Sequence, residues 1–284
     1  MLSLHTNAAS LSTQTALGST QSALSTSMSR LGSGYRINSA MDDAAGLQIA
    51  TRLDAQTRGM AVASRNTQNG ISMMQTAEGA FGEVSNILLR MKDLATQSAD
   101  ASSSANDQTA MQSEFDALGL ELKNIMTNTT FGGATLLKGG KLAAAMTFQI
   151  GSSSSETMAV DLSASMTTLD TNLTAVSANY TAAATGTELT GGGANAMINT
   201  INTAIDSVGT LRAALGANSN RLDHVHNNLA NMSNNTTQAK GRIMDVDYAS
   251  ETANMTSKQM LMQASSAMLK QSSSMSQLVM SLMQ

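Results

Sequence analysis

Few residues in this 284-residue sequence have the type and spacing that chemistry requires. His224 and His226 form the only close pair of histidines, but side chains at i and i+2 of a helix point apart, and no third ligand lies near them. The glycines at 191–193 lack the Lys and the Ser or Thr of a phosphate-binding loop. No Cys is present to serve as nucleophile or metal ligand. Since no nucleophile, base and orienting group come together, we expect neither an enzyme nor a metal or cofactor site.

Methionine is the most unusual component of the composition, with 22 copies. A stripe of methionines could bind copper, but at helical spacing such a stripe is typical of a packed helix face. The sequence has no Pro and no Trp, and only 2% of its residues are aromatic and 13% charged. Because proline is the commonest helix breaker and Ala, Met, Leu and Gln favour helices, long uninterrupted helices are predicted.

The charge pattern excludes two classes of partner. A net charge of −4 without a block of Lys and Arg argues against nucleic acid. No window of 18 apolar residues exists, so no membrane span is expected. Met1–Ser29 and Gln271–Gln284 contain no Asp, Glu, Lys or Arg at all. A solvated helix normally carries charge on its outer face, so we expect both segments to be covered by other copies of the chain.

Both ends of the chain, within the charge-free segments and just beside them, carry apolar residues at helical spacing. The first pattern predicts an amphipathic helix that ends at 32–34, and the second predicts a seam with a seven-residue repeat. We expect the side chains of both patterns to pack in the core of an assembly. They are Leu4, Leu11, Leu17, Leu24, Met28 and Leu31, and Leu261, Met268, Met275, Val279 and Leu282.

Three further heptad seams lie between these segments. They run over 73–94, 111–125 and 197–232, and the last of them predicts a helix about 54 Å long. Residues 35–57 have a looser pattern with scattered charge, which predicts a connector. Alternating residues at 146–150 and 158–162 predict a small β-hairpin, and the Thr- and Ala-rich segment 170–193 predicts surface chain.

These elements together predict a mainly α fold, in which long antiparallel helices from both ends of the chain form a coiled-coil hairpin and a small β-hairpin region lies in mid-chain. Helices at the two ends can pair only if they run side by side. Repeated copies of one subunit that meet through different surfaces extend without closing, which gives a helical filament.

Several strings of this sequence resemble the signatures of bacterial flagellins. They are Arg30–Ala40 (RLGSGYRINSA), Asp42–Gly46 (DDAAG), Gln75–Ala80 (QTAEGA) and Arg242–Ala249 (RIMDVDYA). The resemblance covers roughly residues 1–140 and 195–284. It implies an inner coiled-coil core of residues 1–42 and 240–284, and an outer helical bundle of residues 43–239 with a β-hairpin region at about 133–190. Since only about 50 residues separate the matched parts, little or no large surface-exposed insert domain is expected.

The resemblance also implies a place and a set of partners. The expected product is a structural, extracellular flagellar filament for motility, built from a chain that is exported unfolded through the flagellar type III apparatus. The expected partners are other copies of the chain, an export chaperone at the C-terminal segment, and the filament cap and hook-junction proteins. A hook-filament junction protein of the same superfamily is the alternative, since it shares heptad termini and the export route.

Three residues resemble the positions at which flagellins engage Toll-like receptor 5. They are Arg90, Leu94 and Glu114, although Leu89 replaces the Gln common in strongly stimulatory relatives. The alternative interpretation is that Leu94 is a seam residue and that Arg90 and Glu114 form a solvated pair between adjacent helices. Both interpretations can hold together.

Overall fold

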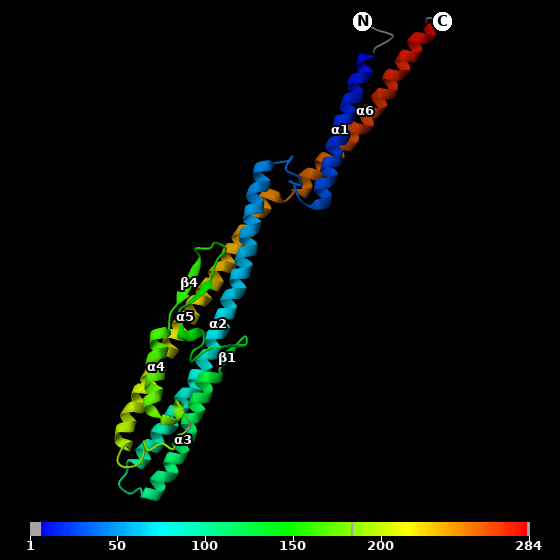
Figure 1. The fold of residues 1–284 in the computed structure, drawn as a ribbon. Coiled ribbons are helices and arrows are strands. Elements are labelled where there is room, and N and C mark those ends of the chain that lie inside the picture. The colour runs from blue at the N-terminus through cyan, green and yellow to red at the C-terminus, as the bar shows by residue number, and fades with distance from the viewer. Residues whose placement is uncertain (1–6, 183, 283–284) are drawn as a thin grey trace. The chain divides into compact units, whose positions relative to one another are not determined.

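A computed structural model describes the backbone of residues 7–182 and 184–282, and the side chains through residue 274. Helices make up most of this chain, which confirms the predicted mainly α fold (Figure 1). The helices are α1 (Ala8–Ser33), α2 (Ala44–Ser98), α3 (Ala105–Asn128), α4 (Ser163–Val176), α5 (Ala194–Met244) and α6 (Tyr248–Leu282). The short elements are β1 (Thr130–Phe131), β2 (Ala134–Thr135), η1 (Lys141–Ala143), β3 (Met146–Gln149), β4 (Thr157–Val160) and η2 (Ala178–Tyr180).

The chain forms two compact units. One consists of residues 1–56 and 234–284, and the other of residues 57–233. Both α2, with 55 residues, and α5, with 51 residues, run from one unit into the other. The sequence predicts an inner layer of residues 1–42 and 240–284 and an outer layer of residues 43–239. These layers are positions in a polymer, so they stay a prediction.

In the unit of residues 57–233, α2 and α5 lie antiparallel and α3 folds back along α2 (Figure 1). Ser64 of α2 is hydrogen-bonded to His226 of α5, and Glu78 pairs with Arg212. Between α2 and α3, Arg90 pairs with Glu114. Residue numbers thus rise along one helix as they fall along its neighbour, as an antiparallel bundle requires.

The core of this unit follows the predicted heptad seams. On α5 the buried seam residues are Ile201, Ala204, Val208, Leu211, Leu215, Leu222 and Leu229. The predicted seam of α2 steps by four and three residues from Met73, and its members Ala77, Val84 and Met91 are buried. Phe81 and Leu88, which these steps leave out, are buried too. The additional residues are buried because α2 packs against both α3 and α5, so a wider arc of its surface is covered.

The predicted β-hairpin is confirmed. β3 and β4 pair antiparallel, with Met146 opposite Val160 and Gln149 opposite Thr157. A second small hairpin, β1 with β2, turns at Gly132 and Gly133. Met158 and Val160 face the helical core and are 4% and 2% exposed, so the strands close one side of the bundle.

Residues 35–57 are not a connector throughout, since α2 begins at Ala44. Oδ1 of Asp43 accepts a hydrogen bond from the backbone N–H of Gly46 at 2.8 Å, which satisfies a free donor of the first helical turn. The charges at Arg52 and Arg58 lie on exposed positions of this helix. The loose pattern therefore marked a mostly solvated helix surface, and the prediction of a connector was wrong beyond residue 43.

Segment 170–193 is also more ordered than predicted, because α4 covers its first part. Met166, Leu169, Leu173 and Val176 follow 3-4-3 spacing and are at most 3% exposed. The Thr and Ala residues between these four concealed the periodicity. The next anchor is Tyr180, which is fully buried, donates from its hydroxyl to Asp170 and lies under the ammonium group of Lys138. Burial raises the pKa of the Tyr180 hydroxyl, with a further contribution from Asp170.

We expect Leu173→Ala to lower the free energy of unfolding of the chain by about 2–5 kcal/mol, because it leaves a cavity under α4. Urea unfolding followed by circular dichroism measures this change. Thr171→Ala, an exposed substitution two residues earlier in the same helix, is the matched control and should stay within about 0.5 kcal/mol. Equal effects of the two substitutions would contradict the packing of α4 into the core.

Candidate functional site

In the unit of residues 1–56 and 234–284, α1 and α6 lie side by side and antiparallel (Figure 1). Asn7 joins the two helices at one end of the pair. Its Oδ1 accepts from the backbone N–H of Ser10, which caps α1. Its Nδ2 donates to the carbonyl oxygen and to the hydroxyl of Ser272 in α6, both at 3.1 Å.

The faces that α1 and α6 turn toward each other are largely polar. On α1, Leu24 and Ser27 are the buried residues of the described helix, and on α6 they are Glu251 and Ser272. The half-buried residues of α6 between these two follow the same 4-3 spacing. They are Met255, Lys258, Met262, Ser265 and Leu269.

The residues predicted to pack in an assembly core fall into three groups. Leu24 is 7% exposed, and Leu17 and Leu31 are half-buried. Four others are exposed, by 66%, 52%, 50% and 64% respectively: Leu11, Met28, Leu261 and Met268. Leu4 lies outside the described residues. Met275, Val279 and Leu282 belong to α6, but their side chains also lie outside the described part of the chain.

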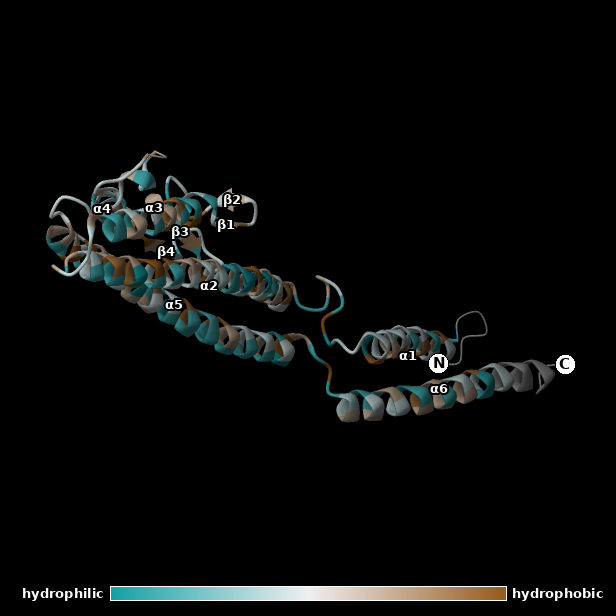
Figure 2. Ribbon diagram, turned by 90° about the horizontal axis from the view of Figure 1, so that it is seen from below, coloured by the Kyte–Doolittle hydropathy of each residue, from teal (hydrophilic) through white to brown (hydrophobic). Residues whose placement is uncertain are grey.

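Within its own pair, α1 and α6 therefore bury very little apolar surface. Among the described hydrophobic side chains of the two helices, Leu24 alone is buried. Hydrophilic and hydrophobic residues alternate along both helices (Figure 2). Since helices in proteins gain most of their stability from packing an apolar face, this pair needs a further partner.

The turn between α1 and α2 holds the two ends of this unit together. Gly34 ends α1 in the left-handed conformation, with a φ of 76°, which favours glycine. Its carbonyl oxygen accepts from the N–H of Val246, and the N–H of Arg36 donates to the carbonyl oxygen of Met244 at 2.6 Å. The Arg36 guanidinium also donates to the carbonyl oxygen of Ile243. Residues 30–40 and 242–249, which carry sequence signatures, thus form one joint.

Asp42 organises the turn from within. Its Oδ2 accepts from the backbone N–H groups of Asn38 and Ser39 and from the Ser39 hydroxyl. Its other oxygen lies 3.4 Å from the guanidinium of Arg30. Hydrogen bonds from the Ser39 and then the Asn38 backbone N–H hold the pKa of the Asp42 carboxyl below its usual value of 3.8.

Arg90 and Glu114 form an ion pair on the unit of residues 57–233. The Arg90 side chain is 54% exposed and the Glu114 side chain 45% exposed, and Nε of Arg90 donates to Oε1 of Glu114 at 2.8 Å. Leu94, one helical turn beyond Arg90, is only 2% exposed and belongs to the hydrophobic core. The structure thus brings Arg90 and Glu114 together at the surface and places Leu94 beneath it.

The candidate ligand groups do not converge. His226 is hydrogen-bonded through Nδ1 to the Ser64 hydroxyl at 3.0 Å, while His224 is exposed on another side of α5. Among the described residues, no group of three or more His, Cys, Asp or Glu side chains could hold a metal ion.

Over the same part of the chain, no helix combines the length and the apolar character needed to cross a membrane.

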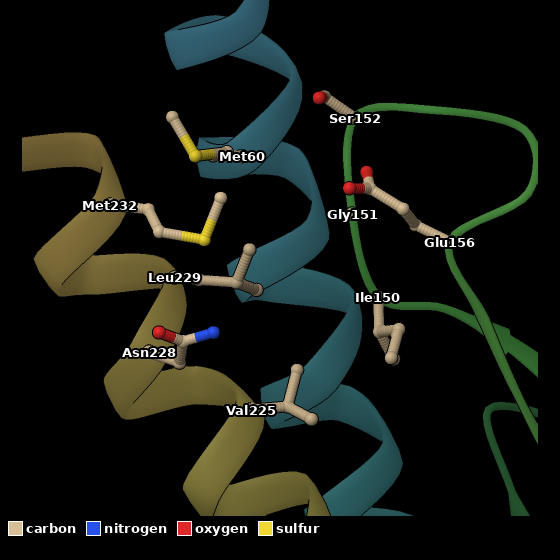
Figure 3. Close-up of a pocket in the computed structure, with 9 residues that line it drawn as sticks. All are labelled: Met60, Ile150, Gly151, Ser152, Glu156, Val225, Asn228, Leu229 and Met232. Atoms are coloured by element: carbon tan, nitrogen blue, oxygen red, sulfur yellow. The ribbon is translucent and has the colours of Figure 1, made fainter. Parts of the chain in front are cut away.

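A small hollow lies between α2, α5 and the loop that joins β3 to β4 (Figure 3). Its volume is about 160 Å³, below the roughly 300–1,000 Å³ of ordinary ligand sites, and Met60, Leu229 and Met232 supply much of its lining. The loop comes so close to α2 that a Cβ on Gly59 would lie 2.6 Å from Cβ of Ser152. The hollow is thus a by-product of packing a loop against two helices and is too small for an ordinary ligand.

Sequence reasoning missed the polar residues that pair α1 with α6. The 4-3 spacing of Met255, Lys258, Met262 and Leu269 was present in the sequence, but polar members interrupt it. Asn7 could have been found only through its residue type, because Asn is favoured at helix N-caps. Its partner Ser272 could not have been found, because the two lie 265 residues apart.

Two family profiles match the chain. The bacterial flagellin N-terminal helical region matches residues 4–141, and the bacterial flagellin C-terminal helical region matches residues 198–283.

Relatives show the same similarity. The chain is 46% identical over 168 residues to polar flagellin F of Vibrio parahaemolyticus, covering 58% of this chain and 44% of that protein. It is 45% identical over 161 residues to flagellin C of Vibrio cholerae, covering 57% and 42%. The chain thus matches less than half the length of these relatives. A solved structure described as a flagellar hook-associated protein from Vibrio parahaemolyticus has a TM-score of 0.58 at 15% identity, over 72% of this chain and 100% of that chain, and shows the fold alone.

We expect Asp42→Asn to loosen the turn at neutral pH and to have no effect in acid. Because the folded-state pKa of Asp42 is lowered, its stabilisation is present above the unfolded value near 3.8 and is lost as the pH falls through the folded value. Amide hydrogen exchange at Asn38 and Ser39 should therefore be faster in the variant at pH 7, and the difference should disappear as the pH falls through the lowered folded-state pKa of Asp42. Asp206→Asn, on an exposed position of α5, is the control. A difference that persists in acid would contradict the role of the ionised carboxylate.

Proposed function

The chain belongs to the bacterial flagellin family, and we propose on that premise that it is a structural subunit that polymerises into the extracellular flagellar filament for motility. Its role is mechanical rather than enzymatic. One observation supports this proposal above the others. The α1–α6 pair exposes Leu11, Leu261 and Met268 but buries only Leu24 among its described hydrophobic side chains.

The α1–α6 pair supplies the inner coiled-coil layer of the proposed filament, with residues 1–42 and 240–284. The two outer ends of the pair, residues 1–29 and 271–284, contain no charged residue, and this favours the position because charged side chains are rarely buried without a partner. Residues 43–239 supply an outer layer. The unit of residues 57–233 suits that position, because it has a large hydrophobic core of its own.

The proposal includes a route to the assembly site. The subunit travels unfolded through the flagellar type III export apparatus, with a chaperone on its C-terminal segment, and joins the filament between the cap and the hook-junction proteins. Two properties of the sequence support this route. A chain without Cys cannot form crosslinks before it folds, and an α1–α6 pair with so little buried apolar surface is easily kept apart.

We expect the double substitution Leu261→Ser and Met268→Ser to weaken polymerisation. Covering these two half-exposed side chains should contribute about 2–3 kcal/mol, which corresponds to a roughly 30- to 150-fold rise in the critical concentration. Sedimentation of filaments grown on seeds measures this concentration. Gln263→Ala, at an exposed polar position of the same helix, is the matched control.

Electron microscopy of the same samples separates the proposed filament from the alternative of a hook-filament junction protein. Unlimited elongation supports the filament subunit, whereas a single terminal layer supports the junction protein. Normal polymerisation of the double variant would show that this face of α6 is not an assembly surface.

We further propose that Toll-like receptor 5 recognises the free subunit through the region of Arg90, Leu94 and Glu114. The half-exposed ion pair supplies the polar contact, and the buried Leu94 acts by holding α2 in place beneath it. The double substitution Arg90→Ala and Glu114→Ala should lower signalling in reporter cells by at least about tenfold.

A second ion pair provides the matched control for this experiment. Glu78 and Arg212 join α2 to α5 with side chains that are 45% and 42% exposed, close to the exposure of Arg90 and Glu114. The double substitution Glu78→Ala and Arg212→Ala should leave signalling unchanged. An equal loss in both double variants, or none in either, would contradict the assignment.

A further inference from the structure

All sulfur atoms of this sequence belong to methionine, because it contains 22 Met and no Cys. A thioether reacts with a peroxide by taking up one oxygen atom. With hydrogen peroxide, the S–O bond forms as the O–O bond breaks, the sulfur is oxidised to a sulfoxide, and the remaining oxygen leaves as water. This reaction turns a flexible apolar side chain into a polar one, and methionine sulfoxide reductases reverse it.

The two units protect their methionines very differently. In the unit of residues 57–233, most methionines are buried, with at most 8% exposure. They are Met60, Met73, Met74, Met91, Met111, Met126, Met158 and Met166. The α1–α6 pair instead has three exposed methionines among its side chains through residue 274. Met28 is 52% exposed, Met260 60% and Met268 64%. A peroxide that reaches the folded subunit therefore has access to these three, as it has to Met41 in the turn before α2, which is 96% exposed.

The three exposed methionines lie on the helices with the least apolar burial of their own. Met260 adjoins Leu261, and Met268 follows one heptad after Leu261, so the three α6 residues belong to the exposed apolar surface of that helix. A sulfoxide oxygen on this surface would be hydrated in the free subunit. Covering it with a second copy would remove that water, which is costly unless a donor replaces it.

We propose that Met28, Met260 and Met268 are modification sites through which peroxide oxidation stops the subunit from polymerising. This inference rests on the proposed filament function. A subunit with unoxidised methionines then joins the polymer, and a subunit with methionine sulfoxides stays free. Reduction of the sulfoxides restores polymerisation; we call this control the oxidation gate. The buried methionines of residues 57–233 take no part, so the oxidised subunit keeps its fold.

The test treats the full chain, as purified monomer, with hydrogen peroxide and maps the oxidised residues by mass spectrometry of peptides. Oxidation should be fast at Met28, Met260 and Met268, and slow at Met74, Met91 and Met126. The critical concentration for polymerisation on seeds should rise by at least about tenfold after treatment. Incubation with both stereospecific methionine sulfoxide reductases should restore the original value.

Two variants assign the effect to individual residues, each compared with its own untreated sample. In the triple variant Met28→Leu, Met260→Leu and Met268→Leu, the ratio of critical concentrations with and without peroxide should fall to about one, because leucine is similar in volume and not oxidised. Met41→Leu is the matched control. Met41 is 96% exposed but lies in the turn before α2, so this variant should keep the full sensitivity to peroxide.

The outcomes separate this inference from the proposed function. If the untreated chain does not polymerise, both are wrong. If it polymerises equally well after Met260 and Met268 are oxidised, or if the triple variant stays sensitive, the filament function stands and the oxidation gate is wrong. Should the triple variant not polymerise at all, repair of the oxidised natural chain by the reductases decides: recovery supports the gate, and no recovery overturns it.

Discussion

The burial of apolar stripes along very long helices is the constraint on which the rest of this structure depends. A helix of 51 or 55 residues is too long for its stability to come from one small core, so it needs a partner along its length. In residues 57–233, α2, α3 and α5 provide that partner for one another, and β3, β4 and α4 close the remaining sides. The α1–α6 pair has the same geometry without the same burial, and its contacts depend on Ser, Thr, Lys and Glu side chains as much as on leucine.

This difference explains which parts of the fold the sequence reveals. Aliphatic residues at 4-3 spacing on α5 identified their helix and its buried side correctly, since Ile201, Val208 and Leu215 have no polar competitor at those positions. The pattern failed for α4, where Thr and Ala surround four buried residues, and at the start of α2, where charges cover a solvated face. The 4-3 pattern also does not identify the helix that covers a given apolar stripe. Leu261 and Met268 have the repeat of a seam, yet the intrachain contact uses Met262 and Leu269, one residue further on.

The family signatures have a structural explanation in the joint between the turn after α1 and the start of α6. Gly34 is needed for its left-handed backbone, Asp42 for its hydrogen bonds to two backbone N–H groups, and Arg36 for its bond across to Ile243. These residues are charged or conformationally special, and none of them belongs to a hydrophobic cluster. Each of these residue types is required by the local backbone geometry. A short string at the joint therefore identifies the family better than a longer stretch of heptad seam, where many apolar residues are interchangeable.

The hydrogen bonds from Asn7 to Ser272 have a consequence for the order in which the chain folds. They join residues that are 265 apart in sequence, and such a contact forms slowly unless the chain between them has already paired. The bundle of residues 57–233 consists mainly of neighbouring helices and hairpins and can form early. The N-terminal helix therefore waits for the last residues of the chain, and in that interval it is the segment most open to proteases and to partners that bind extended polypeptide.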